Sequence, residues 1–526
     1  MWVRHRKRVI LICAGMLAVL FALCLPLNEL VSGTPPMSPV IIHVAVPAFD
    51  RDRNTPIDKE FERRTNLTFD WLQFPVNEYM KRINQVLTSA GQKPDIFIVN
   101  KDMVQRFGPM GLLLDLRPYL DEMPNLRRWI DRYPQIVEDM ITEDGKLYGI
   151  DGLNTYGQMP IGYILREDIF YRNGMLLPTT FDELYESLRR LKQIYPDSKP
   201  ISTRSGPANL FQQFYMAYHT QSGVYFDNNK LNYTFGPAEP NFKKAVLMAR
   251  QFYEAGLIDP DFATVSEPQF FENVIGGKTF ALFGEYFIEM DGWIEKGVKR
   301  DSFYSLKAVL PPLTDQGLQA LQPVQYPNSR GTWVIAIHAK SPHIRELIAL
   351  LDKQYSEEIV ELTNWGIEGD TFNRVNGENR YTARLQTKLN PYGEITPQEA
   401  GVDGRSGIWV PYDQDAEYAR RWGAVGLESQ QLYTANADKI GFFAGPSIPF
   451  STDEFIEITK IMSPIKNFVT LKVIQFVTGE LGMDQDWDDF QDELAKMGAG
   501  SVLKLYQDKY AKLPDERKVL HKSLRH

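Results

Sequence analysis

The sequence predicts an α/β protein of more than one domain, with parallel sheets covered by helices. Three observations lead to this prediction. Short β-branched segments alternate with helical segments through the first hundred residues, as in sheets whose strands are joined by crossover helices. The chain has 526 residues, of which 43% are hydrophobic, enough for about two to four domains with buried cores. The pattern changes near residues 145–165 and again between residues 279 and 337, which marks candidate domain boundaries.

The first elements alternate regularly in type. The predicted strands are residues 40–46, 67–72 and 94–99, and the predicted helices are residues 57–64 and 79–89. This order predicts parallel strands with helices on both faces of the sheet. Ligands of such sheets lie at the carboxyl ends of the strands, so we expect Asp50 and Asn100 to belong to a binding site.

Further strands and helices follow the first change of pattern. Predicted strands cover residues 145–150 (with a turn), 161–165, 279–283 and 332–337, predicted helices cover 209–220 and 240–255, and residues 151–158 form a polar loop. Thr180, with Glu183 three residues later, is a capping box that opens one more helix.

Composition excludes several function classes. The chain has 58 Lys and Arg against 67 Asp and Glu, whereas nucleic-acid binding needs a basic surface. Both cysteines, Cys13 and Cys24, lie in the first 24 residues. The remaining chain therefore has no disulfide, no cysteine–zinc site and no thiol catalysis.

Residues 1–33 are predicted to be a signal or membrane-anchor segment. A basic patch, residues 4–8, precedes an uncharged run over residues 9–27, the usual order for export, with the positive end in the cytoplasm. Three outcomes stay open: cleavage after Gly33, retention as an anchor, or lipidation of Cys24. Each of them places the body of the protein outside the cytoplasmic membrane.

The catalytic and metal motifs that the sequence suggests are incomplete. Residues 276–279 resemble the end of a phosphate loop, but Glu272 stands where its first glycine is required. Ser463-Pro464-Ile465-Lys466 fits the S-x-x-K pattern of serine nucleophiles, but its companion motifs are lacking. The segment is therefore interpreted as a helix start with Ser463 as the cap. Asp484, Asp486 and Asp488 imitate a calcium loop that lacks its glycine and its final glutamate, so they are interpreted as the acidic first turn of a helix. We therefore expect no catalytic residue, no metal site and no cofactor.

Several short segments follow one another in the order found in a known family. These segments are Trp71 to Pro75, Pro94 to Phe97, Gly111 to Leu116, Asp144 to Gly149, Pro178 to Leu184, Gly256 to Pro260, Trp365 to Gly369 with Asn376-Gly377, and Phe476 to Glu480. In this order the chain resembles the family 1 extracellular solute-binding proteins of ABC importers. That carbohydrate-binding group includes maltodextrin-binding proteins, and the chain is similar to its large Gram-positive lipoprotein-type members.

The resemblance implies a periplasmic-binding-protein type II fold with two α/β lobes that close by hinge motion. On this chain the first lobe would be residues 40–154 plus 284–331, and the second residues 155–283 plus 332–480. Residues 481–526 would be C-terminal helices that pack on the first lobe.

Sugar binding needs aromatic faces for the pyranose C–H groups and planar polar groups for the hydroxyls. Such residues occur at the predicted edges of the cleft between the lobes. The candidates are Asp50, Asn100, Asn154, Tyr156, Gln158, Glu285, Trp293, Asn328, Arg330, Trp333, Trp365, Glu368, Arg405 and Trp409. Each has an alternative structural role: the tryptophans as half-buried packing and Glu368 as part of the turn over residues 366–369. Trp487 is expected in the core. Arg204, Arg330 and Arg405 are candidates for a uronic acid.

The resemblance implies a monomeric, non-enzymatic receptor that binds an oligosaccharide and delivers it to the permease subunits of an ABC importer. Two alternatives stay open: a secreted carbohydrate-active enzyme, which needs two carboxylates across a cleft, and a sugar-sensing receptor for a membrane kinase.

Overall fold

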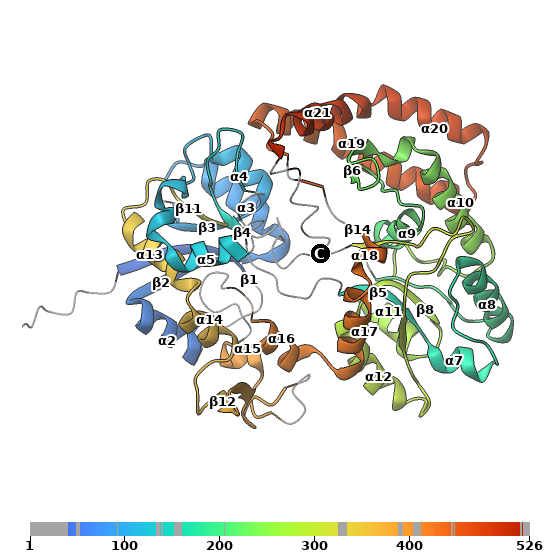
Figure 1. The fold of residues 1–526 in the computed structure, drawn as a ribbon, viewed down its shortest axis with the longest axis horizontal. Helices are drawn as coiled ribbons and strands as arrows, with labels where there is room; N and C mark the ends of the chain where they lie inside the picture. Colours follow the sequence, from blue (N-terminus) through green and yellow to red (C-terminus); the bar gives the residue numbers. More distant parts are fainter. Residues whose placement is uncertain are drawn as a thin grey trace, which may run out of the picture.

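The computed structural model describes residues 40–48, 53–91, 93–132, 137, 140–151, 160–204, 206–323, 334–387, 393–402, 411, 413–442, 445–446, 448–515 and 518. The predicted leader, residues 1–33, lies outside them. Within the described ranges, no helix combines the length and apolar character needed to cross a membrane. Figure 1 shows two α/β lobes, with a layer of C-terminal helices above them.

The first lobe is built on a five-stranded sheet with the order β2-β1-β3-β11-β4. Its strands are β1 (Val40–Ala48), β2 (Leu67–Pro75), β3 (Ile96–Val99), β4 (Ile150–Asp151) and β11 (Val334–Ile337). β1 is parallel to β2 and β3, which confirms the predicted parallel strands, and β11 is antiparallel to β3 and β4. Ile42, Val44 and Ile98 are completely buried, because helices cover both faces of a parallel sheet.

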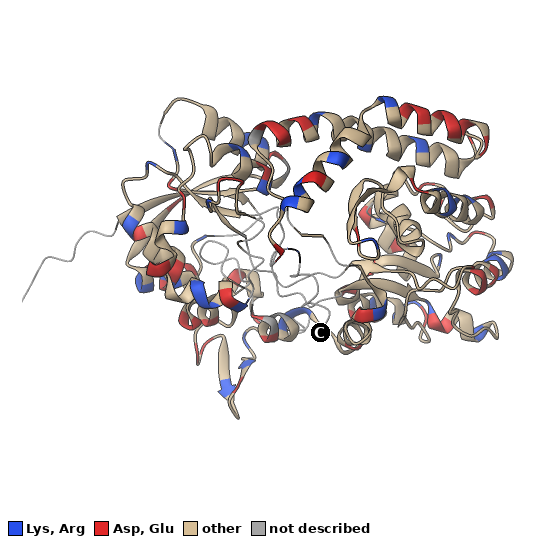
Figure 2. Cartoon of the chain, turned by 45° about the horizontal axis from the view of Figure 1, so that its top comes forward, with Lys and Arg blue, Asp and Glu red and all other residues tan. Residues whose placement is uncertain are grey.

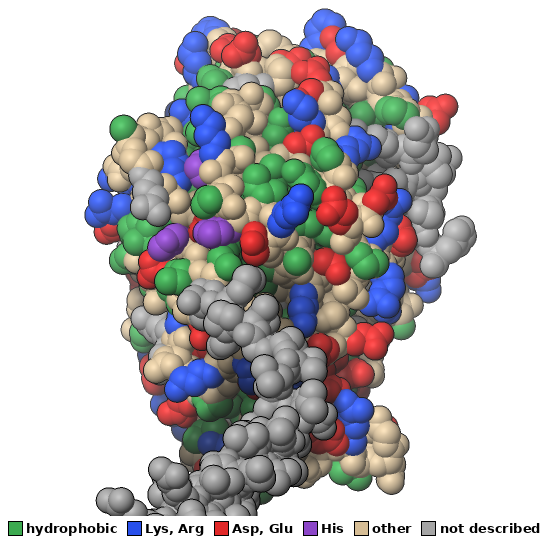
Figure 3. Space-filling view, turned by 90° about the vertical axis from the view of Figure 1, so that its left-hand side faces the viewer, with side chains coloured by type: hydrophobic (Ala, Val, Ile, Leu, Met, Phe, Trp, Pro, Cys, Tyr) green, Lys and Arg blue, Asp and Glu red, His purple; other side chains and the backbone are tan. Residues whose placement is uncertain are grey.

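Helices surround this sheet, and a β-hairpin with two short helices extends below it. The elements are α2 (Pro56–Thr65), α3 (Val76–Thr88), α4 (Lys101–Phe107), η2 (Arg117–Glu122), α5 (Pro124–Arg132), α13 (Ile344–Gln354), α14 (Glu357–Asn364), β12 (Phe372–Val375), β13 (Glu378–Tyr381), α15 (Pro397–Ala400) and α16 (Gln414–Arg421). On the described part of the lobe's outer face, acidic and basic side chains intermingle (Figure 3). Such a surface differs from the basic patch that nucleic acid requires.

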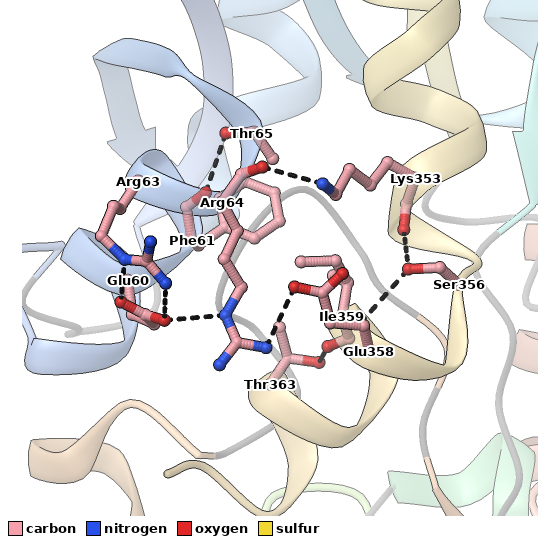
Figure 4. A network of polar contacts seen from close by, with 10 residues as sticks. All are labelled: Glu60, Phe61, Arg63, Arg64, Thr65, Lys353, Ser356, Glu358, Ile359 and Thr363. Carbon is pink, nitrogen blue, oxygen red and sulfur yellow. Dashed lines mark hydrogen bonds and ion pairs between the residues drawn. The ribbon is translucent and has the colours of Figure 1, made fainter. Parts of the chain in front are cut away.

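A polar network joins α2 to the helices α13 and α14 (Figure 4). Glu60 accepts hydrogen bonds from Arg63 Nη2 at 2.7 Å and from Arg64 Nε at 2.8 Å. Arg64 also forms an ion pair with Glu358 at 3.3 Å, and its carbonyl oxygen accepts a bond from Lys353. The hydrogen bonds from the two guanidinium groups lower the pKa of Glu60 to about 2.

Glu60→Gln is expected to lower the stability of the first lobe at neutral pH and to flatten the dependence of that stability on pH. A carboxylate with a lowered folded-state pKa stabilises the fold above its unfolded pKa of about 4.3, and this contribution is lost as the pH falls towards 2. Urea unfolding should therefore show a loss of about 0.2–1 kcal/mol at pH 7 that vanishes near pH 2. Glu186→Gln is the control, because Glu186 pairs with Arg189 on its own helix, α8. An equal loss at pH 7 and pH 2 would contradict the prediction.

The second lobe is built on the three-stranded antiparallel sheet β8-β5-β9. The strands of this sheet are β5 (Ile161–Leu165), β8 (Ala281–Tyr286) and β9 (Lys307–Val309). The second lobe also has two separate strand pairs, β6 (Val224–Asp227) with β7 (Asn232–Phe235) and β10 (Gln322–Pro323) with β14 (Gly441–Phe442). Its helices are α7 (Glu167–Arg172), α8 (Phe181–Ile194), α9 (Gly206–Ala217), η3 (Gly236–Ala238), α10 (Pro240–Glu254), α11 (Glu267–Ile275), η4 (Phe287–Glu289), α12 (Met290–Val298), α17 (Ala424–Thr434) and α18 (Ala437–Ile440). The predicted capping box is confirmed: Thr180 and Glu183 cap α8 reciprocally.

The C-terminal layer consists of α19 (Thr452–Thr478), α20 (Gln485–Lys496) and α21 (Ala499–Lys512). It shares the core of the second lobe: Trp487 lies with its ring centroid 5.1 Å from Phe476 and 6.3 Å from Phe242 of α10. The prediction that the helices of residues 481–526 pack on the first lobe is therefore wrong for α20, while the expectation of a buried Trp487 is confirmed.

Two helix starts were predicted in this layer. Asp486 and Asp488 do form the acidic first turn of α20. Ser463, however, lies inside α19, which is capped by Ser451 and continues through Pro464. The Ser463 prediction is wrong because packing against the second lobe stabilises the helix on both sides of the proline.

The sheet pairings also correct the predicted division of the chain. Residues 284–331 were expected in the first lobe, but β8 and β9 lie in the β5 sheet of the second. Residues 332–480 were expected in the second lobe, but β11 pairs with β3 of the first. The chain therefore stays in the second lobe through β10 and returns to the first lobe with β11. Later in the chain, α17 packs on η4 and α12 of the second lobe.

Candidate functional site

Each sheet has one edge that faces the connections between the lobes. In the first lobe, Val334 pairs with both Val99 and Asp151, so Asn100 lies at the same end of the sheet as these residues. In the second lobe, Ile161 pairs with Tyr286. The chain leaves β4 for β5 after Asp151 and enters β11 at Val334. We call these two ends the interlobe edges.

Glu285 lies on the interlobe edge of the second lobe, opposite Gly162. It is 2% exposed, and its Oε2 lies 3.0 Å from Arg204 Nη2. Burial raises the pKa of Glu285 to about 7, although the Arg204 charge opposes this increase. The carboxyl group therefore changes charge near neutral pH.

Arg204 is surrounded by acidic and aromatic side chains. Besides Glu285, it lies 3.4 Å from Glu267 and 4.0 Å from Glu289. Its guanidinium carbon lies 5.6–5.8 Å from three ring centroids, those of Phe270, Phe271 and Trp293. One cation thus meets three carboxylates, so Arg204 is poorly suited to bind a uronic acid.

Trp293 was predicted to bind ligand, but the structure places it in the core. The side chain is 1% exposed, on α12, and its ring centroid lies 6.2 Å from those of Phe270 and Phe271. No face of the indole is open for a sugar. This prediction is wrong because α12 turns the side chain inward together with Met290.

Trp365 and Glu368 form part of a separate small cluster in the first lobe. Trp365 is 4% exposed and packs with its ring centroid 4.7 Å from Tyr381, so its predicted stacking on a sugar is also wrong. Glu368 lies in the turn between Gly366 and Gly369, both with positive φ, and its side chain faces Arg374 at 3.9 Å. The alternative role as a turn residue fits Glu368 better.

Asn100 caps α4, since its Oδ1 accepts a hydrogen bond from the Met103 amide at 2.9 Å. This fixes the side chain at the end of β3, where the sequence placed it. The other candidates lie outside the described residues and stay predictions: Asp50, Asn154, Tyr156, Gln158, Asn328, Arg330, Trp333, Arg405 and Trp409.

Tyr286 lies at this edge, where the sequence predicted a mixture of aromatic and polar side chains. It ends β8, next to Glu285, and is 46% exposed. Tyr286 is exposed as the last residue of β8, whose five preceding residues are all buried. The interlobe edge of the second lobe thus offers one exposed aromatic ring, while the carboxyl group of Glu285 is buried and paired with Arg204.

Two α/β lobes, between which the chain crosses at strand ends that carry polar and aromatic side chains, are typical of a two-domain solute-binding protein. The profile of the family described as bacterial extracellular solute-binding protein matches residues 52–361, and the chain belongs to this family. The predicted family and the predicted two-lobed α/β fold are confirmed.

Named relatives agree with this assignment. The chain is 22% identical over 490 residues, 86% of each chain, to the fructooligosaccharide ABC transporter substrate-binding protein FusA of Streptococcus pneumoniae. It is 23% identical over 360 residues to the polygalacturonan/rhamnogalacturonan-binding protein YtcQ of Bacillus subtilis, which covers 65% of this chain and 68% of the relative. The crystal structure of the alginate-binding protein AlgQ2 without calcium ion superposes with a TM-score of 0.73 at 21% identity, over 90% of this chain and 99% of AlgQ2.

Proposed function

We propose that this protein is the receptor of an ABC importer and binds an oligosaccharide between its interlobe edges. The observation that carries the proposal is the placement of the exposed Tyr286 at the end of β8 and of Asn100 at the end of β3, at edges that the chain joins. The family, and relatives named for oligosaccharides and polysaccharides, support the same ligand class.

The charge around Arg204 favours a neutral sugar. Three carboxylates surround this single cation, so a uronate approaching the edge of the second lobe would meet net negative charge. Tyr286 offers a ring for the apolar face of a pyranose or furanose, and the carboxyl groups accept hydrogen bonds from hydroxyls.

We propose further that residues 1–33 hold the body at the outer face of the cytoplasmic membrane, or are removed after export. The protein would act as a monomer, deliver its ligand to permease subunits and catalyse no reaction on it. Hinge closure would bring the two edges together and exclude water from the ligand.

Calorimetric titration with a panel of oligosaccharides tests the proposal. The panel contains kestose and maltotriose as neutral sugars, and an alginate oligomer and an oligogalacturonate as charged ones. We expect saturable binding of a neutral sugar, which chromatography recovers intact after incubation. Absence of binding across a broad panel would contradict the carbohydrate proposal, and formation of products would favour the enzyme alternative.

Tyr286→Ala is expected to weaken binding of the panel's tightest sugar by about 1–2 kcal/mol, roughly tenfold, through loss of one stacking face. Tyr286→Phe should retain most of the affinity. Tyr171→Ala is the matched control, because Tyr171 is also exposed, at 53%, but lies on α7. Equal affinities of wild type and Tyr286→Ala would remove Tyr286 from the site.

A further inference from the structure

The C-terminal layer is anchored in the second lobe. Val469 and Phe476 of α19 and Phe490 of α20 are buried in the same cluster as Phe252 of α10. α21 packs on the β6–β7 hairpin, where the ring centroids of Tyr506 and Tyr233 lie 5.0 Å apart. These apolar contacts attach the layer to the core of the second lobe.

The same layer also reaches the first lobe. Figure 1 shows α21 between α4 of the first lobe and β6 of the second, and the colours of Figure 2 mark basic and acidic residues along the C-terminal helices. Lys509 of α21 forms an ion pair with Glu143 at 2.7 Å. Glu143 belongs to the first lobe, because it lies in the turn between the bridged residues Ile141 and Leu147, and Leu147 is buried in that lobe's core.

Lys509 binds a second carboxylate at the same time. Its Nζ lies 2.7 Å from Glu454 of α19, and the lysine side chain is only 15% exposed. Burial opposes the charge of Lys509, but hydrogen bonds to Glu143 and Glu454 raise its pKa above the usual value. The ammonium group therefore separates two carboxylates, one from the first lobe and one from the C-terminal layer.

We propose that Glu143, Lys509 and Glu454 form an electrostatic latch that holds the two lobes in the arrangement of this structure. Hinge motion that separates the 141–147 turn from α21 must break the Lys509–Glu143 pair. Removal of the lysine charge has a stronger effect than loss of one pair, because Glu143 and Glu454 then repel each other. The latch thus sets the equilibrium between lobe arrangements, independently of the ligand.

Distance measurement between spin labels on the two lobes tests the latch. Residues 25–526 contain no cysteine, so Glu122→Cys and Leu176→Cys give one label on each lobe in a full-length chain with Cys13 and Cys24 replaced by serine. Both positions are exposed. In Lys509→Met we expect the population outside the wild-type distance peak to rise about two- to fivefold, and 1 M NaCl should move the wild type in the same direction.

Lys504→Met is the matched control, because Lys504 lies on the same helix and pairs with Asp508. Its distance distribution should superimpose on that of the wild type. The exchange Glu143→Lys with Lys509→Glu, made together with Glu454→Gln, rebuilds the ion pair between the lobes without a second carboxylate beside it, and should move the distribution back towards that of the wild type. A distribution for Lys509→Met that superimposes on the wild type, in a variant with unchanged thermal unfolding, would overturn the proposal.

Discussion

Trp293→Ala is expected to lower the free energy of unfolding by about 3–5 kcal/mol, as large-to-small changes of a buried tryptophan do. The indole is 1% exposed and packs between α11 and α12 beside Phe270 and Phe271. Alanine would leave a cavity that these rings cannot fill without leaving their own contacts. Urea unfolding of the variant and the wild type measures the difference.

Trp293→Phe separates packing from ligand binding. Phenylalanine fills most of the volume, so the stability loss should be smaller than for alanine, and sugar affinity should stay at the wild-type value. Trp487→Ala, in the core that α19, α20 and α10 share, provides a second buried tryptophan for comparison. If the Trp293→Ala variant had wild-type stability but no longer bound sugar, Trp293 would be a ligand contact, as the sequence predicted.

Local signals in the sequence were sufficient for most individual elements. The β-branched run at residues 40–46 is β1, and the capping box of Thr180 and Glu183 starts α8. These features depend on neighbouring residues: strand propensity reflects a few side chains, and a cap needs only its first turn. The same reasoning failed at Ser463, because tertiary packing maintained α19 through Pro464.

The division into lobes depended on partners far away in the sequence. β11 pairs with β3, more than 200 residues earlier, and β8 pairs with β5 more than 100 residues earlier. No local pattern in β11 distinguishes the two sheets, since Val334, Ile335 and Ile337 would be buried in either. The family resemblance supplied the two lobes but not the segment boundaries.

The sequence predicted which strand ends carry the candidate site, but not which of the aromatic side chains near them are exposed. Asn100 and Glu285 lie at the edges where the sequence placed them, whereas Trp293 and Trp365 are core residues. A signal for Trp293 was present in its helix: Met290, Trp293 and Gly297 follow the three- and four-residue spacing of one helical face, and all three are buried. The polar residues between these three positions led to the interpretation of this segment as part of a binding site.

Glu285 makes the stability of the second lobe depend on pH. Its folded-state pKa of about 7 lies above the ordinary value of 4.5, so the folded state binds the proton more tightly than the unfolded state. The contribution of Glu285 to stability is therefore fully present below pH 4.5 and is lost as the pH rises through 7. Glu285→Gln, which cannot ionise, should flatten the decline of stability across this window, by roughly 3 kcal/mol.

Arg204→Met is expected to enlarge this pH dependence. Without the Arg204 charge the folded-state pKa of Glu285 rises further above 7, so the buried carboxyl group takes up a proton on folding at pH 8, and the additional loss there is limited to roughly 1.4 kcal/mol. Below pH 5 the carboxyl group is neutral in the folded state, so most of the loss should disappear. Thermal unfolding of wild type, Arg204→Met and the double variant Arg204→Met with Glu285→Gln, at pH 5 and pH 8, measures both effects. The double variant should recover much of the stability at pH 8, because it buries no charge.

Arg172→Met is the control, because Arg172 is an arginine of the same lobe whose side chain is 38% exposed. A loss of equal size at pH 5 and pH 8 for Arg204→Met would show that its contacts with the aromatic rings, and not its pairing with Glu285, stabilise this edge of the lobe.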